Sequence, residues 1–168
     1  VLSLSLQGCI PAAAGFKSFI DSYDGYEFLY PNGWLEIKVS NGPDVVLHDL
    51  IEETENVSVV ISPVPDGKTL QQLGSPSEVG YSLSKNAIAP PDSGRVADLI
   101  SAEAKEVGPN TYYVLEYAVK LPTQERHNLA SVVVRHGKLY TLNLSTTEQR
   151  WAKKQDSFRQ VVSSFSVY

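Results

Sequence analysis

The stretch "RHNLASVVVRHGKLYTLNLS", residues 126–145, decides the fold of this 168-residue chain. Two runs rich in apolar, β-branched and aromatic residues flank the short connection "HGK", residues 136–138, and this pattern is typical of a β-hairpin. Because a tight hairpin can join only antiparallel neighbours, the sequence predicts an antiparallel sheet at the centre of the molecule.

More strands are predicted before this hairpin. In "YEFLYPNGWLEIKV", residues 26–39, aromatic residues take every second position before "NG" and a largely apolar run follows it, so this stretch predicts a second hairpin. Single strands are expected at "VVLHDL" (45–50), "VSVVISPV" (57–64) and "NTYYVLEYAVKLP" (110–122).

Two segments give a mixed signal. Residues 93–108, "SGRVADLISAEAKEVG", contain good helix formers, but their first half alternates and glycines bracket them. We therefore predict an extended strand there. Residues 16–25, "FKSFIDSYDG", predict a short helical or irregular lead-in.

Helices are predicted in two places. One runs from Ser77 to about Ala89, with Ser75 or Ser77 as its cap and two prolines after it. The other fills most of residues 145–167, where Ser145 and Glu148 have the spacing of a capping box. Its apolar stripe consists of Trp151, Phe158, Val162 and Phe165. Hairpins and covering helices together predict an α+β fold, an antiparallel β-sheet sandwiched between helices.

The net charge and the absence of known catalytic motifs limit the classes of function that the sequence allows. The net charge is −5, and the acidic balance argues against nucleic acid as a partner, because phosphate binding needs a positive surface. The charge is polarised: residues 1–70 carry ten acidic against three basic residues, and residues 124–168 carry three against seven. The sequence holds no G-x-S-x-G, P-loop or Rossmann pattern, so we predict no catalytic residues and no enzyme activity.

A candidate metal site lies in "DVVLHDLIEETE", residues 44–55. Asp44, His48 and Asp49 offer carboxylate and imidazole ligands that suit Zn²⁺ or Mn²⁺, and strand alternation places Asp44 and His48 on one face. The alternative is a solvated acidic turn with a surface histidine. His127 and His136 flank the central hairpin and are expected to be polar edge residues.

Cys9 is the single cysteine, and it follows the apolar run "VLSLSLQG". It could be a nucleophile, an unmodified remnant of a precursor, or the point where a lipid is attached. The residues before it are similar to the end of a signal peptide. No basic group stands near Cys9 in the sequence to hold it as a thiolate, which argues against a nucleophile.

A family resemblance covers residues 16–168. "DGYEFLYPNGW" resembles the opening motif of the PsbP family, extrinsic proteins on the lumenal face of photosystem II. The similarity continues through "NVSVVISPV", "LGSPSEVGYSL", "YYVLEYAV" and "RHNLASVVVRHGKLYTLNLSTTEQRW", and it is greatest to the cyanobacterial branch. The resemblance implies a PsbP-like α-β-α sandwich over residues 16–168. Residues 1–15 would be a signal-peptide remnant, lipobox and tether, with Leu6, Gly8 and the lipidated Cys9 at lipobox positions.

The resemblance also implies a function. Such a protein would be a non-enzymatic accessory protein that binds reaction-centre and core subunits of photosystem II. It would assist assembly or stabilise the oxygen-evolving complex, from the lumenal side of the thylakoid membrane to which a lipid holds it. No cofactor is obligatory, and association with Ca²⁺ follows from the resemblance alone. The alternative is a Zn²⁺ or Mn²⁺ carrier or sensor that acts on the same complex.

Overall fold

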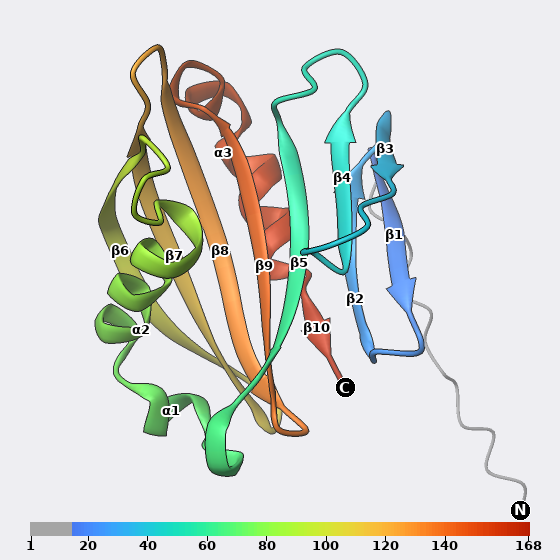
Figure 1. Ribbon diagram of the computed structural model, residues 1–168. Helices are drawn as coiled ribbons and strands as arrows, with labels where there is room; N and C mark the ends of the chain where they lie inside the picture. The colour runs from blue at the N-terminus through green and yellow to red at the C-terminus, as the bar shows by residue number, and fades with distance from the viewer. Residues whose placement is uncertain (1–14) are drawn as a thin grey trace, which may run out of the picture.

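The computed structural model describes residues 15–168, which form two antiparallel sheets and three α-helices (Figure 1). The larger sheet has seven strands in the order β3-β4-β5-β9-β8-β7-β6. Its strands are β3 (Trp34–Ile37), β4 (Val45–Asp49), β5 (Asn56–Pro63), β6 (Val96–Val107), β7 (Asn110–Lys120), β8 (Glu125–Arg135) and β9 (Lys138–Thr147). The smaller sheet has the order β1-β2-β10, with β1 (Phe16–Asp21), β2 (Tyr26–Pro31) and β10 (Ser166–Val167).

The predicted central hairpin is confirmed as β8 and β9. Arg135 pairs with Lys138, so the loop between them is two residues long. His136 and Gly137 both have positive φ, of 50° and 72°, which matches the twist of the flanking strands. Strand β8 lies between β7 and β9, and the strand predicted over residues 93–108 is confirmed as β6 at the edge.

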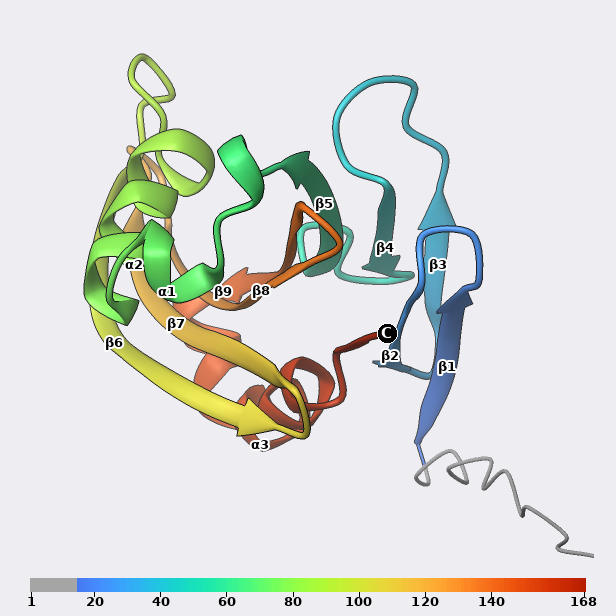
Figure 2. The ribbon, with the colours of Figure 1, turned by 90° about the horizontal axis from the view of Figure 1, so that it is seen from below.

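Helix α3 (Glu148–Ser163) covers one face of the large sheet (Figure 2). Three members of the predicted apolar stripe are buried there, with Trp151, Phe158 and Val162 each at most 6% exposed; the fourth, Phe165, is also buried but lies beyond the end of the helix. Burial of each such side chain stabilises the fold by about 1.5–3 kcal/mol. The predicted cap is wrong: Thr147 caps the helix by accepting a hydrogen bond from the Arg150 amide, because Ser145 is still paired within β9.

The N-terminal expectations need two corrections. Residues 16–21 form strand β1, paired along its whole length with β2, and are neither helical nor irregular. Strands β2 and β3 exist as predicted but do not pair with each other, because the chain passes from one sheet to the other at Asn32-Gly33. Alternation predicted the strands but not their partners. Tyr26 and Phe28 of β2 are buried in the main core, 0% and 2% exposed.

The opposite face of the large sheet is covered over β6 and β7 by a helical insert. The insert contains η1 (Pro65–Gly67), α1 (Leu70–Leu73), α2 (Pro76–Leu83) and the π-helix η2 (Ser84–Ile88). Ser75 caps α2 in a capping box with Glu78, which confirms one of the two caps that the sequence predicted. Gly80 lets α2 approach closely, since a Cβ there would lie 2.9 Å from a methyl group of Leu99. Tyr117 donates a 2.8 Å hydrogen bond to the Gly80 carbonyl.

Helices therefore lie on both faces of an antiparallel sheet, and the predicted α+β class is confirmed (Figures 1 and 2). Among residues 15–168, none of the helices combines the length and apolar character that crossing a bilayer demands.

Candidate functional site

Asp44 lies just before β4 and faces the small sheet. Its Oδ2 accepts a short hydrogen bond from the hydroxyl of Tyr26. Burial and this hydrogen bond raise the pKa of Tyr26. The carboxylates of Asp21, Asp24 and Asp44 have oxygens within 4.8 Å of one another. Burial, together with the nearby charges of Asp44 and Asp21, raises the pKa of Asp24.

His48 and Asp49 lie at the other end of β4 and point to opposite faces, as neighbours on a strand do. The Nδ1 atom of His48 is 2.8 Å from the carbonyl oxygen of Asp49. The Asp49 carboxylate accepts hydrogen bonds from the amides of Glu52 at 2.7 Å and Ile51 at 2.9 Å, and so closes the turn that follows the strand. The Glu52 amide lowers the pKa of Asp49.

The structure does not bring the three predicted metal ligands together. Asp44 and His48 are four positions apart along extended chain, so their Cα atoms are separated by about 13 Å, too far for one ion to bind both side chains. Asp49 uses Oδ1 within its own turn. The oxygens of Asp21, Asp24 and Asp44 are hard ligands of the kind that Ca²⁺ prefers, but Asp21 Oδ1 already accepts from the amides of Tyr23 and Asp24. Metal binding at Asp44, His48 and Asp49 stays a prediction.

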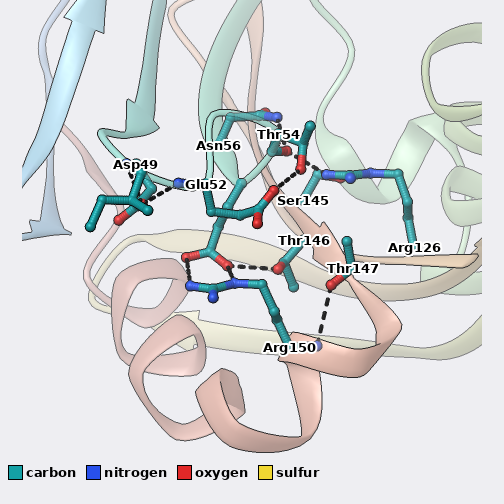
Figure 3. Close-up of polar contacts among 11 residues, drawn as sticks. Asp49, Glu52, Thr54, Asn56, Arg126, Ser145, Thr146, Thr147 and Arg150 are labelled. Carbon is teal, nitrogen blue, oxygen red and sulfur yellow. Dashed lines mark hydrogen bonds and ion pairs between the residues drawn. The ribbon is translucent and has the colours of Figure 1, made fainter. Parts of the chain in front are cut away.

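A buried polar cluster joins the loop just before β5 to α3 (Figure 3). Glu55 is only 2% exposed, and its Oε2 lies 2.6 Å from Nε of Arg150 and 2.7 Å from the hydroxyl of Thr146. The hydrogen bond to Glu55 raises the pKa of Arg150. Both oxygens of the buried Glu55 carboxylate accept hydrogen bonds, from Thr146 and Arg150, so Glu55 helps to hold α3 against the sheet.

Arg126 lies beside this cluster, on the opposite face of the sheet. Its guanidinium donates to the carbonyl of Thr54 at 2.5 Å and to the hydroxyl of Ser145 at 3.0 Å. The Ser145 hydroxyl in turn donates to Asn128 at 3.0 Å. Burial lowers the pKa of Arg126. These contacts fix the loop before β5 to the central hairpin (Figure 3).

His127 is not the polar edge residue that the sequence predicted, because it is 3% exposed and packs beneath α3. Its Nε2 is 2.7 Å from Glu116 of β7, and its Nδ1 is 2.9 Å from Glu148 of α3. The ring stacks on Trp151 with centroids 4.0 Å apart. Arg159 completes the cluster with a 3.1 Å contact to Glu116.

Sequence reasoning missed both clusters. Each joins residues that are 11 to 95 positions apart, and no local spacing marks such pairs. Glu116 stands among aromatic residues in "YYVLEYAV" and Glu55 precedes a strand, but a lone acidic residue in either position is normally solvated. The prediction for Cys9 lies outside the described residues.

The outer face of β3, β4, β5 and β9 remains open beside the helical insert (Figure 1). A shallow hollow of about 380 Å³ on this face is lined by His48, Glu53 and Asn56, with Ile37, Pro43, Val46 and Ser58 around them. A larger pocket of about 730 Å³ continues from it towards α2 and η2. On this face a predicted site residue, His48, lines a hollow that has room for a ligand.

Comparison with known proteins places the chain in a family. The sequence profile described as PsbP matches residues 14–167. The protein CyanoP of Thermosynechococcus vestitus is 53% identical over 168 residues, covering 97% of this chain and 91% of the relative. The CyanoP of Synechocystis is 46% identical over 173 residues, covering 100% of this chain and 92% of the relative.

A solved structure agrees with the sequence relatives. The solution structure of cyanobacterial PsbP, CyanoP, from Synechocystis sp. PCC 6803 has a TM-score of 0.80 and 45% identity to this chain. The alignment covers 98% of this chain and 99% of the solved one. Sequence and fold thus agree along nearly the whole length, and the predicted resemblance is confirmed: the chain belongs to the PsbP family.

Proposed function

We propose that this chain is a non-enzymatic accessory protein that binds the lumenal side of photosystem II. There it would contact reaction-centre and core subunits, and assist assembly or stabilise the oxygen-evolving complex. The observation that carries the proposal is family membership over residues 14–167, with 53% and 46% identity to two CyanoP proteins.

The polar clusters of the fold support a binding role. Glu55, Glu116 and His127 are engaged by neighbouring side chains, and their contacts hold α3 against the large sheet. A general acid or base must reach a substrate proton, and each of these groups instead contacts a partner within the fold. A rigid sheet with helices fixed on both faces is suited to present surfaces to a partner.

Attachment to the membrane through Cys9 belongs to the same proposal. A single acyl chain gives only marginal, reversible binding to a bilayer, whereas two or more chains give stable anchoring. A diacylglyceryl group on Cys9 would therefore hold the domain at the thylakoid membrane, and residues 10–15 would form a short tether.

The polarised charge supports an electrostatic part to docking. Residues 124–168 carry seven basic against three acidic residues, and the exposed Lys153 and Lys154 lie on α3. Attraction between exposed charges weakens as the ionic strength rises, since the Debye length is about 10 Å at 0.1 M salt. We therefore expect the complex to weaken with salt.

The test is affinity capture of the tagged full-length protein from detergent-solubilised thylakoids at low and moderate salt. We expect reaction-centre and core subunits in the captured fraction, with less at moderate salt. Capture of no reaction-centre or core subunit at either salt concentration would contradict the proposal.

The intact mass of the protein purified from its membrane reports the lipid on Cys9 directly. Cys9→Ser is the matched control: it should move the protein to the soluble fraction and leave capture from a solubilised extract intact.

A further inference from the structure

The larger pocket on the open face has two walls of different origin. Strands β5, β8 and β9 supply its floor, with Val60, Val132 and Leu139 as apolar members. The helical insert supplies the facing wall, with Val79, Leu83 and Ile88 as the corresponding residues. The pocket volume of about 730 Å³ falls within the range of about 300–1,000 Å³ that is common for small-molecule sites.

The lining is uncharged. Eighteen described residues line the pocket, and none of them is Asp, Glu, Lys, Arg or His, although such charges make up a fifth of the chain. A charged ligand would lose its hydration there without an opposite charge to replace it. The lining of this pocket therefore favours an uncharged ligand body.

Neutral polar groups in the lining give the site hydrogen-bonding capacity. Asn143 accepts from Asn128 through Oδ1, which leaves its amide nitrogen as a donor. Asn86 donates to the Ser82 hydroxyl through Nδ2, which leaves its Oδ1 as an acceptor. A few polar groups among many apolar ones are typical of sites that orient a ligand.

A second feature of the wall points to a ligand. Three lining residues, Asn86 to Ile88, belong to the π-helix η2. A π-helix is rare and is found frequently at functional sites, because it displaces side chains from the positions of a regular helix.

The smaller hollow with His48 adjoins the pocket, because Pro43 and Ser58 line both. We propose that the pocket binds a neutral amphipathic molecule, with its apolar body between η2 and β5 and its hydrogen-bonding head group in the hollow beside His48, Glu53 and Asn56. The proposal is independent of docking to photosystem II.

Binding of an uncharged, apolar ligand body in the pocket is tested with the full-length protein and Nile red, an uncharged fluorescent probe. We expect saturable binding that monodecanoylglycerol and methyl decanoate displace, with decanoate at pH 8 at least tenfold weaker than either. Equal displacement by decanoate would contradict selection for a neutral ligand. Displacement by a synthetic peptide of residues 1–14 would instead assign the pocket to the chain's own first residues and overturn the proposal.

Two substitutions locate the site. Val60 is 39% exposed on the pocket floor, so Val60→Trp should fill the pocket without disturbing the core and weaken Nile red binding at least tenfold. Ile20→Trp, on the distant strand β1, is the matched control and should leave binding unchanged. Equal affinity of Val60→Trp and wild type, with both variants folded by circular dichroism, would overturn the proposal.

A separate measurement tests the position of the head group. His48→Ala should weaken monodecanoylglycerol about threefold and leave methyl decanoate, which lacks the glycerol hydroxyls, unchanged. Equal effects on the two competitors, or none on either, would contradict the placement of the head group beside His48.

Discussion

Arg150 of α3 and Glu55, the residue just before β5, form an ion pair, with Nε and Oε2 2.6 Å apart, that ties the helix to the sheet. The two ends differ in exposure: the Glu55 side chain is 2% exposed and the Arg150 side chain 35%. Removal of the cation therefore leaves a carboxylate where water has little access.

We expect Arg150→Ala to lower the free energy of unfolding by about 2 kcal/mol. Breaking a fully buried pair costs about 3–5 kcal/mol, and the partial exposure of Arg150 reduces that loss. Urea denaturation followed by circular dichroism measures the change. Lys153→Ala, an exposed residue on the same helix, should change it by less than about 0.5 kcal/mol. Equal values for the two variants would show that the pair contributes nothing to stability.

Glu116 gives a prediction of pH dependence. Burial alone would raise the pKa of Glu116, but hydrogen bonds from His127 and Arg159 outweigh burial and hold the pKa below its usual value of 4.5. Since folding lowers this pKa, the group stabilises the fold fully above pH 4.5, and that contribution is lost as the pH falls through the folded pKa.

The expected result concerns the difference in unfolding free energy between wild type and Glu116→Gln. We expect the wild type to be the more stable at pH 7, with a difference that shrinks below pH 4.5. His127, Glu148 and Arg159 belong to the same cluster and are present in both proteins. Glu103→Gln, at an exposed position of β6, is the control. A difference that stays constant from pH 7 to pH 3 would contradict the prediction.

Local patterns in the sequence predicted the elements of the large sheet. The strands of the central hairpin, the edge strand β6 and the stripe of α3 were all readable, because alternation and helical spacing reflect which side of an element is buried. The resemblance to the PsbP family was readable for a similar reason, because its motifs are continuous stretches of chain.

The pairing of strands that are distant in the sequence could not be predicted from local patterns. The strand at Tyr26 was predicted to pair with the strand at Trp34, yet it pairs with β1 and β10, and β10 comes from the other end of the chain. Likewise His127 meets Glu116 and Glu148 only after three elements pack together. The sequence shows which residues carry polar or ionisable side chains, but the pairing of strands and the packing of helices decide which of these side chains meet.

Gly25 closes the turn between β1 and β2 against the last residue of the described chain. Its φ is +75°, and a Cβ would lie 2.9 Å from the carbonyl oxygen of Tyr168, whose amide donates to Gly25 at 3.0 Å. Gly33 has a similar φ of +86° but open space around it. Alanine should therefore cost about 1 kcal/mol of strain at Gly33 and at least about 1 kcal/mol more at Gly25.

The two glycine variants form a matched pair, because the backbone strain is common to both and the contact with Tyr168 is not. Thermal and urea unfolding of Gly25→Ala and Gly33→Ala give the comparison. Equal losses of stability would show that the C-terminal contact adds nothing to the constraint on Gly25.

The predicted metal ligands can be tested for a shared ion with a double-mutant cycle. Asp44 lies beside Asp21 and Asp24, whereas His48 lies at the far end of β4 with its ring against the Asp49 carbonyl. Residues that share one ion are coupled, and residues that do not are additive within about 0.3–0.5 kcal/mol. Calorimetric titration of Zn²⁺ and Mn²⁺ into wild type, Asp44→Asn, His48→Ala and the double variant measures this coupling. We expect additive effects because the strand separates the two residues, and a coupling of 1 kcal/mol or more would show that one ion joins them.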